Sequence, residues 1–307
     1  MQGPFQTRKV GILYDVPHHV LYRNALRIFN YLSKEGFSCH TFPGSDTSVD
    51  LGSFDFLILV WWDGITSRIR SVPKYVHIFP WICDHFSWNT PRRMRRLMSV
   101  LSRSAAAFSS NVILKGALET YTKFSMHLLE DGVDVSAFKF FRRRSREDHK
   151  VTLGWVGNLN IPSGRVKNFE LASALEKNFE SSVSLKMADG SIPFGEMPAW
   201  YQGIDIFLCT SLSEGTPNPF LECLSTGATY LASSVGIIPE FHSLSEGRGG
   251  VVVPTIDLPI FSVGLASLLK RRSHFVEMGR LNRKIITDYW TNEQTLKPLL
   301  DVLRVFC

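Results

Sequence analysis

The chain has 307 residues, of which 44% are apolar, and a formal net charge of +6, which is enough chain for two ordinary domains. Its longest mostly apolar run, at 54–62, is too short for a transmembrane helix, which needs roughly 20 residues, and its start lacks the apolar core of a signal peptide. The five cysteines show neither disulfide nor metal-ligand spacing, so we expect a cytoplasmic protein whose basic balance favours acidic partners.

The first half of the chain alternates strand-like and helix-like segments. Residues 9–16 are typical of a buried strand, and 21–36 carries its apolar residues on one helical face. A second helix is predicted at 90–104, with Thr90 as its cap and Pro91 as its first helical residue. Further strands are predicted at 37–42, 54–62 and 74–82.

The second half repeats this alternation after a charged segment at 138–150, where we place an interdomain linker. Short strands alternating with helices indicate βαβ units and a parallel sheet. The predicted fold class is therefore α/β, with one Rossmann-like domain over 1–145 and another over 146–287. A last helix at about 288–307 is expected to pack back on the first domain. Ligands of such sheets bind beyond the carboxyl ends of the strands.

The segment EGTPNPFLE begins with Glu214 and ends with Glu222. Asn218 is predicted to cap a helix that continues with Pro219, which leaves Glu214 in a loop after a strand and Glu222 in the first helical turn. Carboxylates accept hydrogen bonds from pairs of hydroxyls, and the N-terminus of a helix attracts anions. The layout therefore fits a ligand with hydroxyls at two ends and phosphates between them, which describes a nucleotide sugar.

Several motifs, in order along the chain, resemble those of retaining GT-B glycosyltransferases, particularly the large fourth family. EGTPNPFLE is similar to the Glu-x7-Glu signature of that family, and YQGIDIFLCTSLSEG resembles the run into it. GWVGN with KNFELA resembles the opening of the donor domain, and VGIIPEF and GGVVVP resemble the blocks after the signature. AAFSSNVILKGAL and EDGVDVSAFKF resemble segments before the interdomain crossover. The resemblance covers roughly 105–260 well and implies the GT-B fold, in which two Rossmann-like domains face a cleft.

The resemblance also implies roles for single residues on the donor side. Glu214 would contact the donor sugar, Glu222 the ribose of the nucleotide, and Lys167 the diphosphate. Asn158 stands where the family usually has an arginine, and Arg165 could replace that arginine. The other residues expected to lie against the nucleotide sugar are Gly157, Gly215, Thr216, Pro217 and Asn218.

The implied reaction moves a hexosyl group from a nucleotide-diphosphate sugar to an acceptor, with retention of anomeric configuration. Negative charge develops on the leaving phosphate, so cations and N–H dipoles do most of the work. His85 is the candidate for the family's histidine near the reacting carbon, beside Glu214 and Lys167 as catalytic residues. No cofactor besides the donor substrate and no metal ion are implied, because GT-B enzymes usually lack a metal-binding Asp-x-Asp.

Each candidate also has a plain structural alternative. The two glutamates could be helix-cap or surface carboxylates, Lys167 a solvated lysine, and His85 a packed histidine. The protein could also be a catalytically inactive module that binds a nucleotide or nucleic acid, or a phosphorylase or sugar-phosphate synthase on the same fold.

The acceptor is left open by the sequence. The helix at 90–104 is basic, and it would lie on an anionic membrane with its methionines and leucines inward, which suits a lipid-linked or surface glycan. Its arginines would equally follow the phosphates of a nucleic acid, as in a glycosyltransferase that modifies hydroxylated DNA bases, or they form a solvated face. The arginines concerned are Arg92, Arg93, Arg95 and Arg96.

Overall fold

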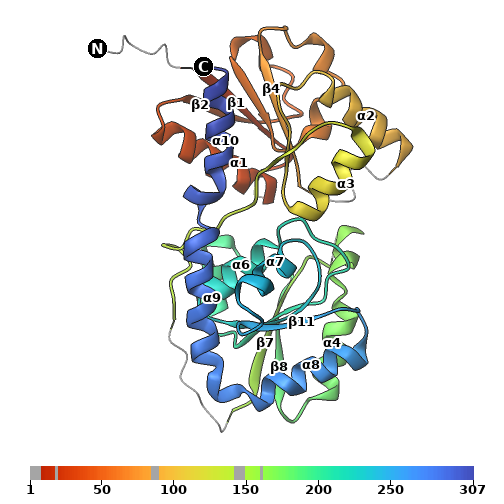
Figure 1. Ribbon diagram of the computed structural model, residues 1–307, viewed down its shortest axis with the longest axis vertical. Coiled ribbons are helices and arrows are strands. Elements are labelled where there is room, and N and C mark those ends of the chain that lie inside the picture. The colour runs from red at the N-terminus through yellow and green to blue at the C-terminus, as the bar shows by residue number, and fades with distance from the viewer. Residues whose placement is uncertain (1–7, 18–19, 84–89, 142–148, 160–161) are drawn as a thin grey trace. The chain divides into compact units, whose positions relative to one another are not determined.

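The computed structural model describes residues 8–17, 20–83, 90–141, 149–159 and 162–307. Its internal contacts divide the chain into two compact units, one of Met1–Asp131 with Asn292–Cys307 and one of Gly132–Thr291 (Figure 1). The sequence placed the boundary at residue 145, whereas the division falls at Asp131. The segment after Asp131 is held by the second unit, because Ser225 donates a hydrogen bond to the carbonyl of Phe138.

The first unit is a parallel α/β sandwich. Its elements are β1 (Lys9–Tyr14), α1 (Val20–Lys34), β2 (Ser38–Pro43), β3 (Phe56–Leu59), β4 (His77–Ile82), α2 (Pro91–Leu101), β5 (Phe108–Ser109), α3 (Val112–Thr122), β6 (His127–Leu128) and α10 (Asn292–Val305), with 3-10 turns at Leu51–Ser53, Trp62–Ile65 and Ile69–Ser71. The strand order is β2-β1-β3-β4-β5-β6, and all the pairings are parallel.

Alternation along the strands gives the first sheet two buried faces. Ile12 of β1 packs in a cluster with apolar residues of α1 and α10, and the next residue, Leu13, packs in another cluster with those of α2 and α3. Figure 1 shows α10 running beside α1, which agrees with the contacts between these two helices. The last helix of the chain therefore completes the core of the first unit.

The predicted strand at 54–62 is shorter in the structure, where β3 ends at Leu59. The N–H groups of Val60 and Trp61 both donate to the carbonyl oxygen of Leu13, so the ladder with β1 does not advance further. The chain then turns at Trp62–Ile65. Burial alone predicted a longer strand because the turn residues are apolar too.

The second unit repeats the architecture. Its elements are β7 (Val151–Val156), α4 (Phe169–Asn178), β8 (Val183–Ala188), α5 (Met197–Gln202), β9 (Ile206–Cys209), α6 (Asn218–Ser225), β10 (Thr229–Ser233), α7 (Ile238–Leu244), β11 (Gly250–Val253), α8 (Leu258–Lys270) and α9 (Phe275–Tyr289), with 3-10 turns at Pro162–Lys167, Phe194–Glu196 and Arg272–His274. The strand order is β11-β10-β9-β7-β8, and all the pairings are parallel.

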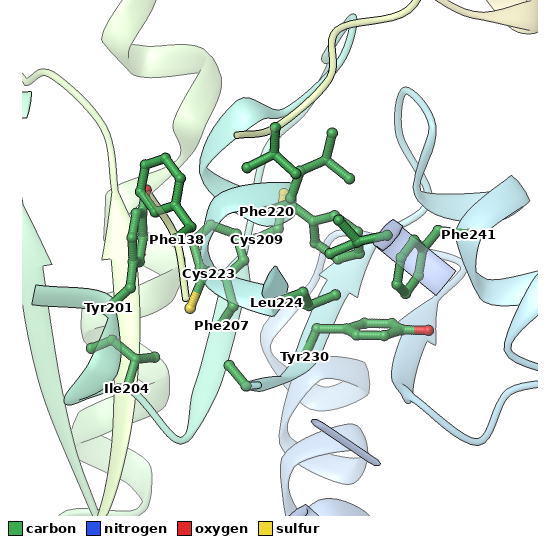
Figure 2. Packing of buried hydrophobic residues seen from close by; sticks show 14 of the residues in the cluster. Phe138, Tyr201, Ile204, Phe207, Cys209, Phe220, Cys223, Leu224, Tyr230 and Phe241 are labelled. Carbon is green, nitrogen blue, oxygen red and sulfur yellow. The ribbon is translucent and has the colours of Figure 1, made fainter. Parts of the chain in front are cut away.

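Aromatic packing anchors α6 on the second sheet. The ring of Phe220 lies 5.2 Å from that of Tyr230 on β10 and 6.2 Å from that of Phe207 on β9, measured between centroids, in edge-to-face arrangements. Figure 2 shows these side chains with Leu224 and Phe241 in one buried cluster. This packing fixes the helix that follows the loop at the carboxyl end of β9.

None of the helices in the described part of the chain is long and apolar enough to cross a membrane.

Candidate active site

The predicted donor-side residues gather at the carboxyl ends of β7 and β9. These strands are parallel neighbours, so the turn after β7 and the loop after β9 emerge at the same edge of the sheet, where open α/β sheets bind ligands. A pocket opens at this edge. It is lined by Trp155, Val156, Lys167, Phe207, Leu208, Cys209, Thr210, Ser211, Glu214, Pro217 and Pro219.

Lys167, Glu214 and Ser211 form a hydrogen-bonded cluster in this pocket. The ammonium Nζ of Lys167 donates to Oε1 of Glu214 at 2.6 Å, and the Ser211 hydroxyl donates to the same oxygen at 2.6 Å. The side chains of Lys167 and Glu214 are 26% and 12% exposed. Burial lowers the pKa of Lys167, but the charge of Glu214 and its hydrogen bond outweigh burial and hold that pKa above its ordinary value.

A second set of hydrogen bonds fixes the backbone of Lys167. The hydroxyl of Thr210, directly after β9, lies 2.7 Å from the carbonyl oxygen of Lys167 and 2.9 Å from that of Asn168. The indole Nε1–H of Trp155 donates to the Thr210 hydroxyl oxygen at 3.1 Å. Two turns that are far apart in sequence are thereby joined, and the lysine is presented to Glu214.

The loop between Glu214 and α6 is closely packed. Gly215, Thr216 and Pro217 are buried. Gly236 has a φ of +57°, and a Cβ at that position would lie 2.2 Å from the carbonyl oxygen of Gly215. Only glycine fits there without strain or a shift of the loop, so Gly236 permits the approach that sets the position of Glu214.

Helix α6 begins one residue earlier than predicted. Asn218 is its first helical residue and Pro217 its cap, because the carbonyl oxygen of Pro217 already accepts from the N–H of Phe220 at 2.8 Å. The prediction of Asn218 as cap was therefore wrong. Glu222 consequently lies in the second turn of the helix and not in the first.

Glu222 hydrogen-bonds to a residue outside the lysine cluster. The phenolic hydroxyl of Tyr201, on α5, donates to Oε2 of Glu222 at 2.8 Å. Tyr201 is 0% exposed and Glu222 is 8% exposed. The structure thus joins Glu214 to Lys167 and Ser211, and Glu222 to Tyr201.

Sequence reasoning missed Ser211 and Tyr201. Both lie within YQGIDIFLCTSLSEG, but Tyr201 looks like any apolar-face aromatic of a helix, and Ser211 like any loop serine. Their roles follow from hydrogen bonds that spacing does not reveal.

The remaining donor-side candidates are less closely tied to the cluster. Gly157 is buried, and its N–H donates to the carbonyl oxygen of Ala188 on β8 at 3.0 Å. Asn158 is half-buried, and Arg165 is exposed in the 3-10 turn that ends at Lys167. His85 lies outside the described residues. Within those residues, no group of three or more His, Cys, Asp or Glu side chains could hold a metal ion.

The basic helix begins at Pro91, with the side chain of Thr90 accepting from the N–H of Arg93. Its leucines do not face outward: Leu97 and Leu101 are buried in the core of the first unit. The expectation that the leucine face turns toward a membrane was therefore wrong, because the unit's own sheet and helices already cover it. Arg96 pairs with Asp63 at 3.1 Å. The exposed arginines of the helix are Arg92, Arg93 and Arg95.

The two units have the architecture of the GT-B glycosyltransferases. The chain matches sucrose-phosphate synthase from Thermosynechococcus elongatus (10% identity, TM-score 0.74, 97% of this chain and 98% of that one). It also matches Anabaena Alr3699/HepE in complex with UDP, with 10% identity and a TM-score of 0.70 over 97% of this chain and 100% of that one. A further match is the apo form of the lipopolysaccharide outer core galactosyltransferase WaaB, with 13% identity and a TM-score of 0.68 over 97% of this chain and 100% of that one.

Residues 125–271 match the family model described as glycosyl transferases group 1. This matched segment holds Lys167, Ser211 and Glu214. No curated protein sequence matches it significantly.

Proposed function

We propose that the protein transfers a hexosyl group from a nucleotide-diphosphate sugar to an acceptor, with retention of anomeric configuration. The observation that carries this proposal is the cluster of Lys167, Ser211 and Glu214 at the carboxyl edge of the second sheet, next to the start of α6. The UDP in the Anabaena neighbour agrees with a nucleotide donor. We also propose a cytoplasmic location, as expected from the scattered cysteines.

Lys167 would stabilise the leaving diphosphate. Its ammonium group has three N–H donors and stays charged at neutral pH because Glu214 raises its pKa. A diphosphate bound at this edge of the sheet would share these donors with Glu214. A fixed cation where negative charge develops is the largest type of contribution to such a reaction, and the amino end of α6 would add oriented N–H dipoles.

Glu214 would receive the donor sugar. Lys167 and Ser211 both bind Oε1, and a carboxylate has about four acceptor positions over its two oxygens. Oε2 would therefore accept hydrogen bonds from sugar hydroxyls. Glu222, on the next helix, would accept from the ribose of the nucleotide, and the backbone of Gly215, Thr216 and Pro217 would lie along the molecule between the two acids.

For the acceptor, we propose a lipid-linked or surface glycan. The exposed arginines Arg92, Arg93 and Arg95 support contact with an anionic surface through charge alone, because the leucine face of α2 is packed in the core. Sedimentation with vesicles that contain anionic lipid should decrease when the three arginines are changed to glutamine. Retention on DNA in place of vesicles would favour the alternative, a transferase acting on hydroxylated DNA bases.

The donor reaction is tested with purified protein and a panel of nucleotide sugars. A true donor should raise the melting temperature by mass action and release free nucleotide slowly even without an acceptor. NMR of the product sugar gives its anomeric configuration. Binding without release or transfer, with any donor, would identify an inactive module and overturn the proposal.

Variants then assign the two acids. Glu214→Gln should mainly lower turnover, and Glu222→Gln should mainly weaken nucleotide binding. Glu180→Gln, at an exposed position of the same unit, is the matched control. Normal turnover and binding in both site variants would refute the assigned roles.

A further inference from the structure

Tyr201 is a buried tyrosine of α5 that hydrogen-bonds to Glu222. Its hydroxyl lies 2.8 Å from Oε2 of Glu222. The two residues stand on different helices, α5 and α6, which contact each other. The hydrogen bond therefore ties the direction of the carboxylate to the core and not only to the backbone of α6.

The ring of Tyr201 holds this hydroxyl in one direction. The ring is completely buried, with its centroid 5.2 Å from Trp200 and 5.9 Å from Phe138. Figure 2 shows it beside Phe138 and Ile204 in the cluster that supports α6. Close packing on the ring leaves the side chain little freedom to turn, so the O–H points at Glu222 before any ligand binds.

A buried carboxylate is costly unless donors satisfy it, and a donor to an ionised acceptor is stronger than a neutral pair. The Tyr201 hydroxyl occupies one acceptor position of Glu222, and a carboxylate has about four. When a ligand hydroxyl binds this acid, the phenol already fixes its side chain. Preorganisation of this kind improves binding because the ligand does not have to order the side chain.

We infer that Tyr201 is a positioning residue which, through its hydrogen bond to Glu222, sets the preference of the nucleotide site for ribose hydroxyls. This inference rests on the proposed function, in which Glu222 receives the ribose. Tyr201 does not touch the reacting atoms. Its loss should therefore weaken recognition of the ribose and leave the turnover of bound donor nearly unchanged.

The test measures the affinities of UDP, ADP and GDP and of their 2′,3′-dideoxy forms, for the wild type and for Tyr201→Phe. The substitution keeps the ring and removes only the hydroxyl. We expect the wild type to bind the ribose form of at least one nucleotide more tightly than its dideoxy form. In the variant, the ratio of these two affinities should be about tenfold smaller, as for the loss of a hydrogen bond to a charged group. The affinity for the dideoxy form should stay the same.

Tyr230→Phe is the matched control, because Tyr230 is a buried tyrosine of the same cluster whose hydroxyl bonds to His242 and Ser245. It should leave the ribose preference unchanged. Glu222→Gln provides a second, independent test. This substitution should reduce the ribose preference by itself, and the double variant with Tyr201→Phe should show no further reduction. If Tyr201→Phe folds poorly, a ribose preference that survives in Glu222→Gln overturns the inference.

The possible outcomes separate the inference from the function on which it rests. A full ribose preference in Tyr201→Phe, or equal weakening of the ribose and dideoxy forms, refutes the positioning role and leaves the proposed function standing. If the wild type binds none of the three nucleotides UDP, ADP and GDP, the nucleotide site is refuted and the inference with it.

Discussion

The two ends of the EGTPNPFLE segment place the same kind of side chain in different surroundings. Glu214 is in a loop, and its partners are a lysine and a serine that line the same small pocket. Glu222 is in the second turn of a helix, and its partner is a phenol in the core. The element that carries each acid, more than the spacing between them, decides its partner.

This difference determines what each acid can do. The Lys167–Glu214 pair is partly exposed, so water weakens the attraction between the two charges, and an incoming anion can open the pair. The Tyr201–Glu222 pair is buried in the core, so water competes less with its hydrogen bond. One acid is thus in a contact that a ligand can rearrange, and the other is in a contact that stays.

The largest expected effect is that of Lys167→Met, which should lower turnover at saturating donor by about 10² to 10³, as for the loss of a group that stabilises developing charge. Lys177→Met, at an exposed position of α4, should change turnover less than twofold. Nearly normal turnover in the Lys167 variant would mean that the pair is structural.

Gly236→Ala should come next, with turnover reduced about tenfold or more. Its Cβ would collide with the carbonyl oxygen of Gly215, and its φ of +57° is strained for alanine, so the loop that carries Glu214 must shift. Nucleotide affinity, which we assign to Glu222, should fall less. Gly195→Ala, where a Cβ meets nothing within 4 Å, is the control, and an equal fall in affinity and turnover would contradict the separation.

Ser211→Ala should have a smaller effect, about three- to tenfold in turnover, because it removes one of the two hydrogen bonds to Oε1 of Glu214. Steady-state kinetics on the variant and on Ser267→Ala, at an exposed position of α8, provide the comparison. A change in nucleotide affinity alone would place Ser211 in a different role.

The smallest effect concerns stability at alkaline pH. Because the pKa of Lys167 in the folded protein is raised above the ordinary lysine value of 10.5, its pair with Glu214 contributes fully below that pH, and the contribution is lost as pH rises through the folded pKa. The difference in melting temperature between wild type and Lys167→Met should thus be constant from pH 7 to about 9 and shrink above 10.5. A difference that does not depend on pH would exclude the ion pair as its cause.

The sequence predicted the α/β class because its hydrophobic periods are local and regular. The Thr90 cap and Pro91 start of α2 were likewise correct, since a cap is decided by neighbouring residues. The start of α6 was wrong by one residue because the carbonyl of Pro217 enters the helical bonding, which no residue type signals.

Long-range polar contacts could not be predicted in the same way. Arg96 looked like its neighbours on a basic helix, and its pairing with Asp63 depends on where a turn far away in the chain arrives. The family resemblance named Lys167 and Glu214 as donor contacts, but their contact with each other comes from the order of β7 and β9 in the sheet. Tyr201 carried no polar signal at all, because its ring belongs to the core.

The packing of α10 in the first unit has a consequence for folding during synthesis. Its leucines Leu296, Leu299, Leu300 and Leu303 belong to the cluster that covers one face of the first sheet, whereas the second unit is one continuous stretch of chain. Because α10 is synthesised after the second unit, the first unit keeps an uncovered apolar surface until α10 has left the ribosomal exit tunnel. The second unit can therefore complete its core before the first unit does. Until then, the exposed apolar face of the first sheet is where a chaperone would be needed.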